Sequence, residues 1–81
     1  MELQERIKQL IWKNTDYRGD IFQESRLIND LHLESLDLLM LLNAIEDEFS
    51  IEINGDDLEG LYTVSDITGV IQKILDQKAA S

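Results

Sequence analysis

Residues 35–50 read SLDLLMLLNAIEDEFS, and the spacing of the apolar side chains in this stretch decides the fold class. These side chains recur at i, i+3, i+4, i+7 and i+11, the repeat of one helix face: Leu38, Leu41, Leu42, Ile45 and Phe49. The sequence therefore predicts a helix that begins near Ser35, ends near Ser50 and buries a broad apolar stripe.

Two further amphipathic helices are predicted on either side of this one. Residues 2–14 carry an apolar face made of Leu3, Ile7, Leu10 and Ile11. Residues 63–77 carry another, made of Ile67, Val70, Ile71 and Ile74. Thr63 and Asp66 have the spacing of a capping box, which predicts where this last helix begins. Residues 56–61 can form a short helical turn with Leu58 and Leu61 pointing inward.

The first two helices are separated by a segment of about twenty residues, 15–34, which is long for a compact domain. Its apolar residues can anchor it over the core: Ile21, Phe22, Leu27, Ile28, Leu31 and Leu33. We expect one all-α domain spanning residues 1–81. Its fold would be a small bundle of three longer helices and one short helix, with a long loop between the first two.

The chain of 81 residues has a formal net charge of -10, and this charge is unevenly distributed. Residues 1–26 hold five acids and five bases, whereas residues 27–72 hold eleven acids and neither Lys nor Arg. Glu46, Asp47 and Glu48 also lie near a helix C-terminus, where the dipole disfavours anions. We therefore expect these acids to serve basic partners, which clustered charge steers into contact.

Composition excludes several classes of protein. The chain has no Cys, so neither a disulfide scaffold nor a cysteine-based zinc site is possible. The acidic balance is opposite to that of a nucleic-acid-binding surface. The longest apolar run, residues 38–42, is far too short to span a membrane. The charged start of the chain does not resemble a secretory leader, so we expect a cytoplasmic protein.

Ser35 and His32 are the side chains that could carry chemistry. On composition alone, Ser35 is interpreted first as an N-cap, because serine there accepts a hydrogen bond from a free backbone N–H. A serine hydrolase is disfavoured, since the chain has no G-x-S-x-G and only one His. His32 is interpreted as a solvated loop residue, and we expect no dedicated metal site.

The run DLHLESLDLL (30–39), followed by AIEDEFSIEI (44–53), resembles the acyl carrier protein family. That family opens its second helix with a D-S-L motif and continues with L-E-x-x-F-x-[IV]-x-[IV]. Residues 5–11 look like the family's first helix, and Thr63-Val64 like the start of its last. The resemblance covers nearly the whole chain, including the long first loop.

The resemblance implies a specific role for Ser35. The matching serine of the family carries a 4'-phosphopantetheine arm, which a phosphopantetheinyl transferase adds from coenzyme A with magnesium. The modified chain would be a phosphoprotein that holds acyl groups as thioesters on the arm's thiol. It would act in fatty acid or related lipid biosynthesis as a substrate of enzymes, without catalysis of its own.

The resemblance also divides the second helix into two faces. The inward face would shelter an acyl chain together with residues from elsewhere: Leu27, Leu31, Leu38, Leu41, Leu42, Ile45, Leu58 and Leu61. The outward face would dock basic patches of acyl-transferring and synthase enzymes: Glu34, Leu36, Asp37, Leu39, Met40, Asn43, Glu46 and Asp47. We expect the chain to work as a monomer.

Three departures from the family pattern bear on its partners. Glu34 replaces the usual Asp before the serine, His32 and Leu33 replace small residues, and Met40 replaces a frequent acid. Leu36, Leu39 and Met40 should form an exposed apolar patch, which indicates partners with a more apolar groove. Two alternatives stay open: a carrier of polyketide or aminoacyl intermediates, and an acidic helical adaptor without a prosthetic group.

Overall fold

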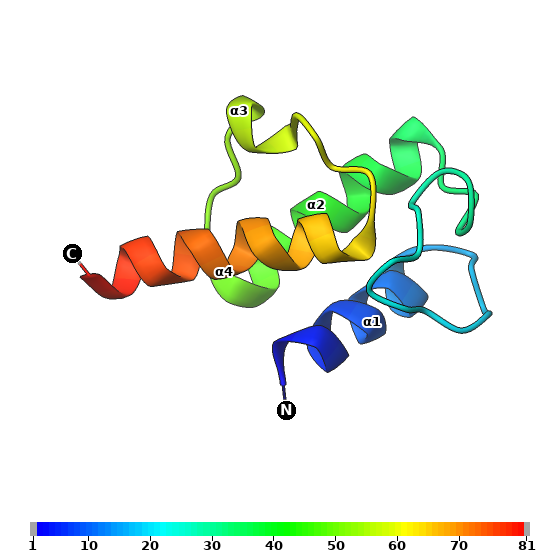
Figure 1. Ribbon diagram of the computed structural model, residues 1–81, viewed down its shortest axis with the longest axis horizontal. Helices are drawn as coiled ribbons and strands as arrows, with labels where there is room; N and C mark the ends of the chain where they lie inside the picture. Colours follow the sequence, from blue (N-terminus) through cyan, green and yellow to red (C-terminus); the bar gives the residue numbers. More distant parts are fainter. Residues whose placement is uncertain (1, 81) are drawn as a thin grey trace.

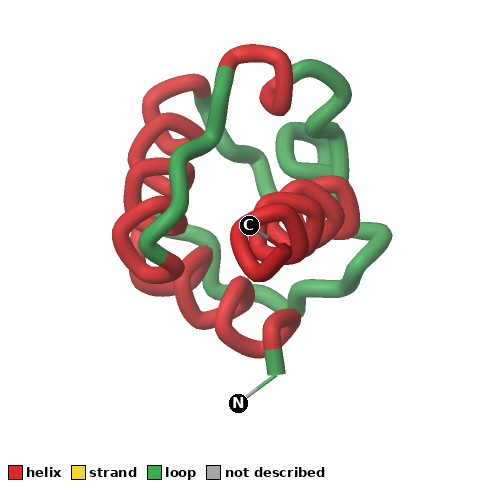
Figure 2. The backbone as a smooth tube through the Cα atoms, turned by 90° about the vertical axis from the view of Figure 1, so that its left-hand side faces the viewer, coloured by secondary structure: helices red, strands yellow, loops and turns green. Residues whose placement is uncertain are grey.

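The computed structural model describes residues 2–80 and contains four helices (Figure 1). They are α1 (Leu3–Asn14), α2 (Ser35–Phe49), α3 (Gly55–Leu58) and α4 (Val64–Ala80). The predicted all-α architecture of three longer helices and one short helix is confirmed. Figure 2 looks almost along α4 and shows the other helices and the loops arranged around it.

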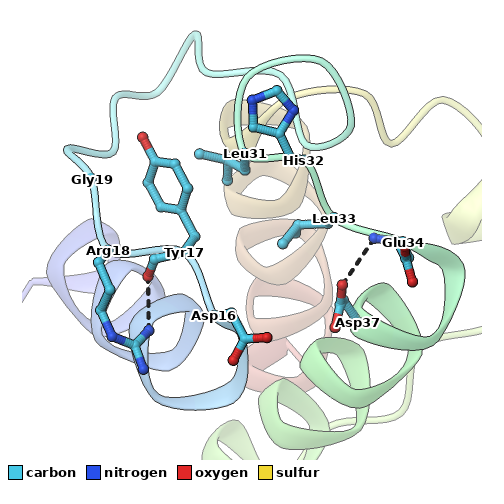
Figure 3. A pocket seen from close by; sticks show the side chains of 9 residues that line it. All are labelled: Asp16, Tyr17, Arg18, Gly19, Leu31, His32, Leu33, Glu34 and Asp37. Atoms are coloured by element: carbon cyan, nitrogen blue, oxygen red, sulfur yellow. Dashed lines mark hydrogen bonds between the residues drawn. The ribbon is translucent and has the colours of Figure 1, made fainter.

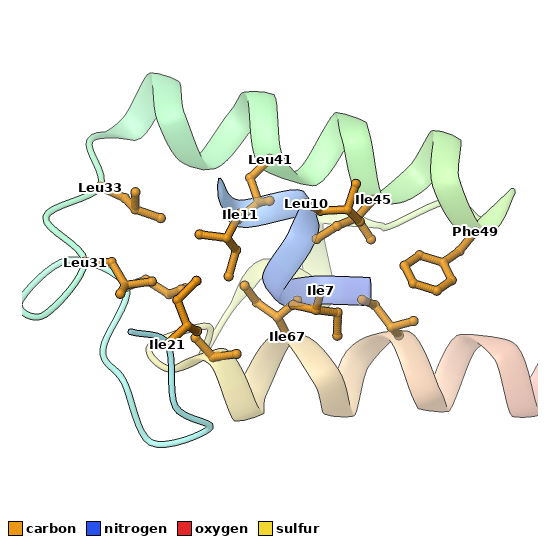
Figure 4. Close-up of a cluster of buried hydrophobic side chains, with 13 residues drawn as sticks. Ile7, Leu10, Ile11, Ile21, Leu31, Leu33, Leu41, Ile45, Phe49 and Ile67 are labelled. Atoms are coloured by element: carbon orange, nitrogen blue, oxygen red, sulfur yellow. The ribbon is translucent and has the colours of Figure 1, made fainter. Parts of the chain in front are cut away.

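The apolar faces of α1, α2 and α4 meet in one core, to which the long loop also contributes (Figure 4). Ile7 and Ile11 come from α1, and Leu41 and Ile45 from α2; all four side chains are completely buried. Ile67 and Ile71 of α4 close the core from the other side. Helix α1 packs mainly against α2 and less extensively against α4.

The N-cap residue of α2 is not the one that was expected. Glu34 is the N-cap residue, and its backbone N–H donates to Asp37 Oδ2 at 3.0 Å. Ser35 is the first helical residue, so the interpretation of Ser35 as the N-cap is wrong. Helix α2 ends at Phe49, and its C-cap residue Ser50 takes a left-handed conformation with φ 54° and donates its N–H to the Glu46 carbonyl.

The long loop is attached to the start of α4 through its backbone. Leu27 N–H donates to the Tyr62 carbonyl at 2.8 Å, and Val64 N–H donates to the Ser25 carbonyl at 3.0 Å. The predicted anchors Ile21, Leu27, Leu31 and Leu33 are buried. The prediction was wrong for Phe22 and Ile28, whose side chains are 56% and 62% exposed. Each directly follows a buried residue, Ile21 and Leu27 respectively, so neighbouring side chains of the loop differ in exposure.

Two carboxylates, one in the long loop and one at the start of α4, stabilise turns by accepting hydrogen bonds from backbone N–H groups. Asp66 Oδ2 accepts from Thr63 N–H at 2.9 Å, while Asp66 N–H donates to Thr63 Oγ1 at 3.2 Å, which confirms the predicted capping box. The backbone N–H groups of Tyr62 and Thr63 lower the pKa of Asp66. The Arg26 N–H does the same to the pKa of Asp30, which it reaches at 2.7 Å.

Two of the acids near the end of α2 already interact with other groups of the chain. Glu46 Oε2 accepts the half-buried N–H of Ile53 at 2.8 Å, which ties the segment after α2 back to the helix. Glu48 forms an ion pair with Arg6 at 2.8 Å, and the guanidinium also lies over the Phe49 ring. Glu46 and Glu48 therefore contribute to the stability of the fold, and their expected role toward basic partners stays a prediction. Asp47 forms no hydrogen bond or ion pair within residues 2–80.

Candidate functional site

Ser35 lies at the positive end of α2 with its side chain exposed. Within residues 2–80, no group forms a hydrogen bond with its hydroxyl. The first N–H groups of a helix have no acceptor inside the helix, and the helix dipole favours negative charge there. The position thus presents a free hydroxyl where an attached anionic group would be stabilised.

An apolar groove of about 280 Å³ opens beside Ser35 between α2, α3 and the start of α4. Besides Ser35, its walls are entirely aliphatic: Leu27, Leu38, Leu39, Leu42, Leu58, Leu61 and Ile67. Polar side chains other than Ser35 are missing from this lining, so the groove suits a hydrocarbon chain. We call it the Ser35 groove.

Five of the eight residues expected to shelter an acyl chain line the Ser35 groove: Leu27, Leu38, Leu42, Leu58 and Leu61. Leu31 of the long loop and Leu41 and Ile45 of α2 do not line it; all three are buried in the core. Leu58 is 43% exposed and forms an outer wall, which corrects its expected inward orientation. Sequence reasoning missed Ile67, although its place in the periodic face of α4 had predicted its burial.

The outward face of α2 combines an apolar patch with few free acids. Leu36, Leu39 and Met40 are 64%, 57% and 47% exposed, as expected. Asn43 and Asp47 are also exposed. Asp37 and Glu46, which were expected to face partners, have carboxylate oxygens that already accept backbone N–H groups. Both carboxylates keep their charge, but these hydrogen bonds fix their orientation.

A larger hollow of about 560 Å³ lies on the other side of the α2 start, between the long loop and the helix (Figure 3). Its lining includes His32, Glu34 and Asp37, but Ser35 is absent from it. His32 is exposed and has a left-handed backbone, with φ 57°. Across the described part of the chain, no three His, Asp or Glu side chains gather as metal ligands would. Over the same range, none of the helices combines the length and the hydropathy of a transmembrane segment.

Known proteins similar to this chain indicate its family. A family model described as the phosphopantetheine attachment site matches residues 5–71. Acyl carrier proteins from two strains of Buchnera aphidicola subsp. Acyrthosiphon pisum, Tuc7 and APS, are 39% identical over 72 residues. Each alignment covers 88% of this chain and 90% of the relative.

The fold has a solved counterpart as well. The structure of a candidate acyl carrier protein from Mycobacterium tuberculosis matches with a TM-score of 0.83 and 29% identity, covering 89% of this chain and 97% of that chain. The predicted resemblance is thereby confirmed. The chain belongs to the acyl carrier protein family, in which 4'-phosphopantetheine is the attached cofactor.

Proposed function

We propose that Ser35 is the residue to which 4'-phosphopantetheine is attached, and that the chain carries acyl intermediates without catalysing their conversion. The observation that supports this best is the position of Ser35. Its exposed hydroxyl lies at the N-terminus of α2 and on the rim of an apolar groove. When bound, the cofactor supplies the thiol to which acyl groups are joined as thioesters.

The environment of Ser35 fits the cofactor's phosphodiester. Unpaired N–H groups and the dipole of α2 favour an anion on this residue. Glu34 and Asp37 lie beside it, but the Asp37 carboxylate is held against the Glu34 N–H at 3.0 Å. Ser35 needs no base of its own, because the phosphopantetheinyl transferase that modifies it activates the hydroxyl.

The lining of the Ser35 groove favours an aliphatic cargo. Each CH₂ group moved from water into an apolar site contributes about 0.8 kcal/mol. An aminoacyl or polyketide chain would place its polar groups against Leu38, Leu42 and Ile67, where no hydrogen-bond partner is offered. We therefore favour acyl chains of fatty acid or related biosynthesis over the polar alternatives.

The exposed patch on α2 favours partners with an apolar contact region. Leu36, Leu39 and Met40 flank Ser35 along the helix, and Leu58 of α3 adds a fourth exposed apolar side chain beside the groove. Glu34, Asn43 and Asp47 provide the exposed polar groups of the same face. We propose that the transferase and acyl-handling enzymes meet this face with an apolar centre and a basic rim.

Several broader aspects of the proposal rest on the family and on composition. Relatives that cover most of the chain are acyl carrier proteins. We propose that the chain acts in the cytoplasm, as its composition suggests. We also propose that it is a monomer, because a net charge of -10 opposes association between copies.

Attachment is tested by the intact mass of the chain after incubation with coenzyme A, magnesium and a broad-specificity phosphopantetheinyl transferase. The wild type should gain one phosphopantetheine, and Ser35→Ala should gain none. Ser65→Ala is the matched control, because Ser65 is also exposed and lies in the first turn of α4. An unmodified wild type, or equal modification of Ser35→Ala, would contradict the proposal and favour an adaptor.

The cargo is tested by comparing the melting temperatures of the octanoyl-loaded and acetyl-loaded chain. A sheltered octanoyl chain should raise the melting temperature, because binding within the folded state stabilises it. Leu42→Asn should reduce that difference, since it places an amide in the wall of the groove. Equal melting temperatures for the two wild-type forms would count against an aliphatic cargo.

A further inference from the structure

A groove lined by α1, the long loop and the end of α2 has the opposite charge from the chain as a whole. This α1 groove measures about 720 Å³, and its walls include Arg6, Gln9, Trp12, Lys13, Arg18 and Glu48. Three cations thus line it with a single carboxylate, although the chain's net charge is -10. Apart from Glu48, none of the acids of the chain belongs to this lining.

Two of these cations are not neutralised by a carboxylate. Glu48 is paired with Arg6 at 2.8 Å, so these two charges compensate each other. Arg18 Nη1 donates to the backbone carbonyls of Trp12, Thr15 and Tyr17 at 3.0, 2.8 and 2.9 Å, which orients the guanidinium but leaves its charge. Lys13 is exposed, and within residues 2–80 no carboxylate lies at ion-pair distance from it. Asp47 shares a neighbouring hollow with Lys13 without pairing.

Three polar side chains of the α1 groove lie along one face of α1. Arg6, Gln9 and Lys13 lie at i, i+3 and i+7, which places them on one face of α1. At 1.5 Å per residue, Arg6 and Lys13 are about 10 Å apart along the helix axis. Because Arg6 is paired with Glu48, the uncompensated cations are Lys13 of α1 and Arg18 of the long loop. A peptide that carries several carboxylates can pair with both of them.

The wall of the groove also has the properties of a protein interface. The Trp12 side chain is half-buried, and its indole N–H donates to the Gly19 carbonyl at 2.9 Å, which fixes the ring. Tryptophan and arginine are enriched among the residues that dominate binding at protein interfaces.

We propose that the α1 groove binds an acidic segment of a partner protein. A second copy of the chain is a poor occupant, because two chains of charge -10 repel each other. The proposal needs neither the cofactor nor the α2 face, so it does not rest on the function of Ser35. A partner bound in this way would place an acidic segment against α1.

The test uses the unmodified, ¹⁵N-labelled chain and a synthetic peptide of alternating Glu and Leu, followed by NMR at physiological salt. At this ionic strength the Debye length is about 8 Å, so distant acids of the chain are screened more than contacts inside the groove. The peptide should shift the Trp12 indole signal and the backbone amides of residues 6–18. A Lys-Leu peptide of equal length should leave these signals unchanged.

Lys13→Glu and Lys8→Glu form a matched pair of variants. Each changes the net charge by the same amount, but Lys8 lies outside the lining of the groove and pairs with Glu5 at 3.7 Å. Lys13→Glu should weaken peptide binding by about fivefold or more, on the scale of an exposed ion pair, and Lys8→Glu should change it less than about twofold. Far-UV circular dichroism should show both variants folded.

Three results would overturn the proposal. The first is the absence of shifts at millimolar peptide, and the second is equal weakening by both variants. The third is a dependence of the same signals on the concentration of the chain alone, which would make a second copy the occupant.

Discussion

Glu46 and Asp47 are adjacent acids near the end of α2, and we expect their removal to have very different effects. Glu46 Oε2 accepts the half-buried Ile53 N–H at 2.8 Å. Hydrogen bonds to charged groups contribute about 1.5–3 kcal/mol, and Glu46→Ala would also leave the Ile53 donor without its partner. Asp47 is exposed and forms no ion pair within residues 2–80, so Asp47→Ala should change the free energy of unfolding by less than about 0.5 kcal/mol.

Thermal unfolding followed by circular dichroism separates these outcomes. In a domain of this size, 1 kcal/mol shifts the melting temperature by about 4–8 °C, so Glu46→Ala should lower it by roughly 6–24 °C. Glu46→Gln should lie between Glu46→Ala and the wild type, because its amide oxygen can still accept the bond. Asp47→Ala should melt close to the wild type, since it also removes an anion from the unfavourable end of the helix dipole.

Equal melting temperatures for Glu46→Ala and Asp47→Ala would refute this reasoning. That result would mean that the Ile53 bond does not stabilise the fold, and that both acids are available for partners. The expected difference would instead leave Asp47 as the free acid of this segment.

Other consequences of the structure can be measured in the same way. Backbone N–H groups lower the pKa of Asp66, so its contribution is complete above the ordinary pKa of about 4 and is lost as the pH falls through the lowered value. Asp66→Asn should therefore flatten the loss of stability below about pH 4 in urea unfolding; an unchanged pH profile would contradict this. Leu41 is completely buried, so Leu41→Ala should cost about 2–5 kcal/mol, while exposed Leu36→Ala should be nearly neutral. Added salt should raise the melting temperature by screening the eleven acids of residues 27–72, and a flat titration would show that their repulsion is unimportant.

The fold was predictable because its helices are strongly periodic. The spacing of Leu38, Leu41 and Ile45 predicted α2 and its buried stripe, and Thr63 and Asp66 predicted the start of α4. The loop was harder, because residues 15–34 have no regular repeat. Sequence alone could not indicate that Ile21 is buried while Phe22, the next residue, is exposed.

The lining of the Ser35 groove could not be predicted in full from the sequence. Leu41 and Leu42 belong to the same apolar stripe, yet only Leu42 lines the groove. That division depends on where α3 lies, which local periodicity does not determine. The roles of the acids are equally non-local: Glu48 pairs with Arg6, 42 residues away, and Asp57 approaches Lys73 at 3.9 Å. Cations outside residues 27–72 thus compensate part of the negative charge of that segment.

Localising the mass gain within the chain tests the central claim most directly. Trypsin cannot cut between Arg26 and Lys73, because residues 27–72 contain neither Lys nor Arg, so Ser35, Ser50 and Ser65 stay on one peptide. After incubation with coenzyme A and the transferase, fragmentation of that peptide should place one phosphopantetheine on Ser35. A modification on Ser50 or Ser65, or an unmodified peptide, would contradict the assignment of Ser35.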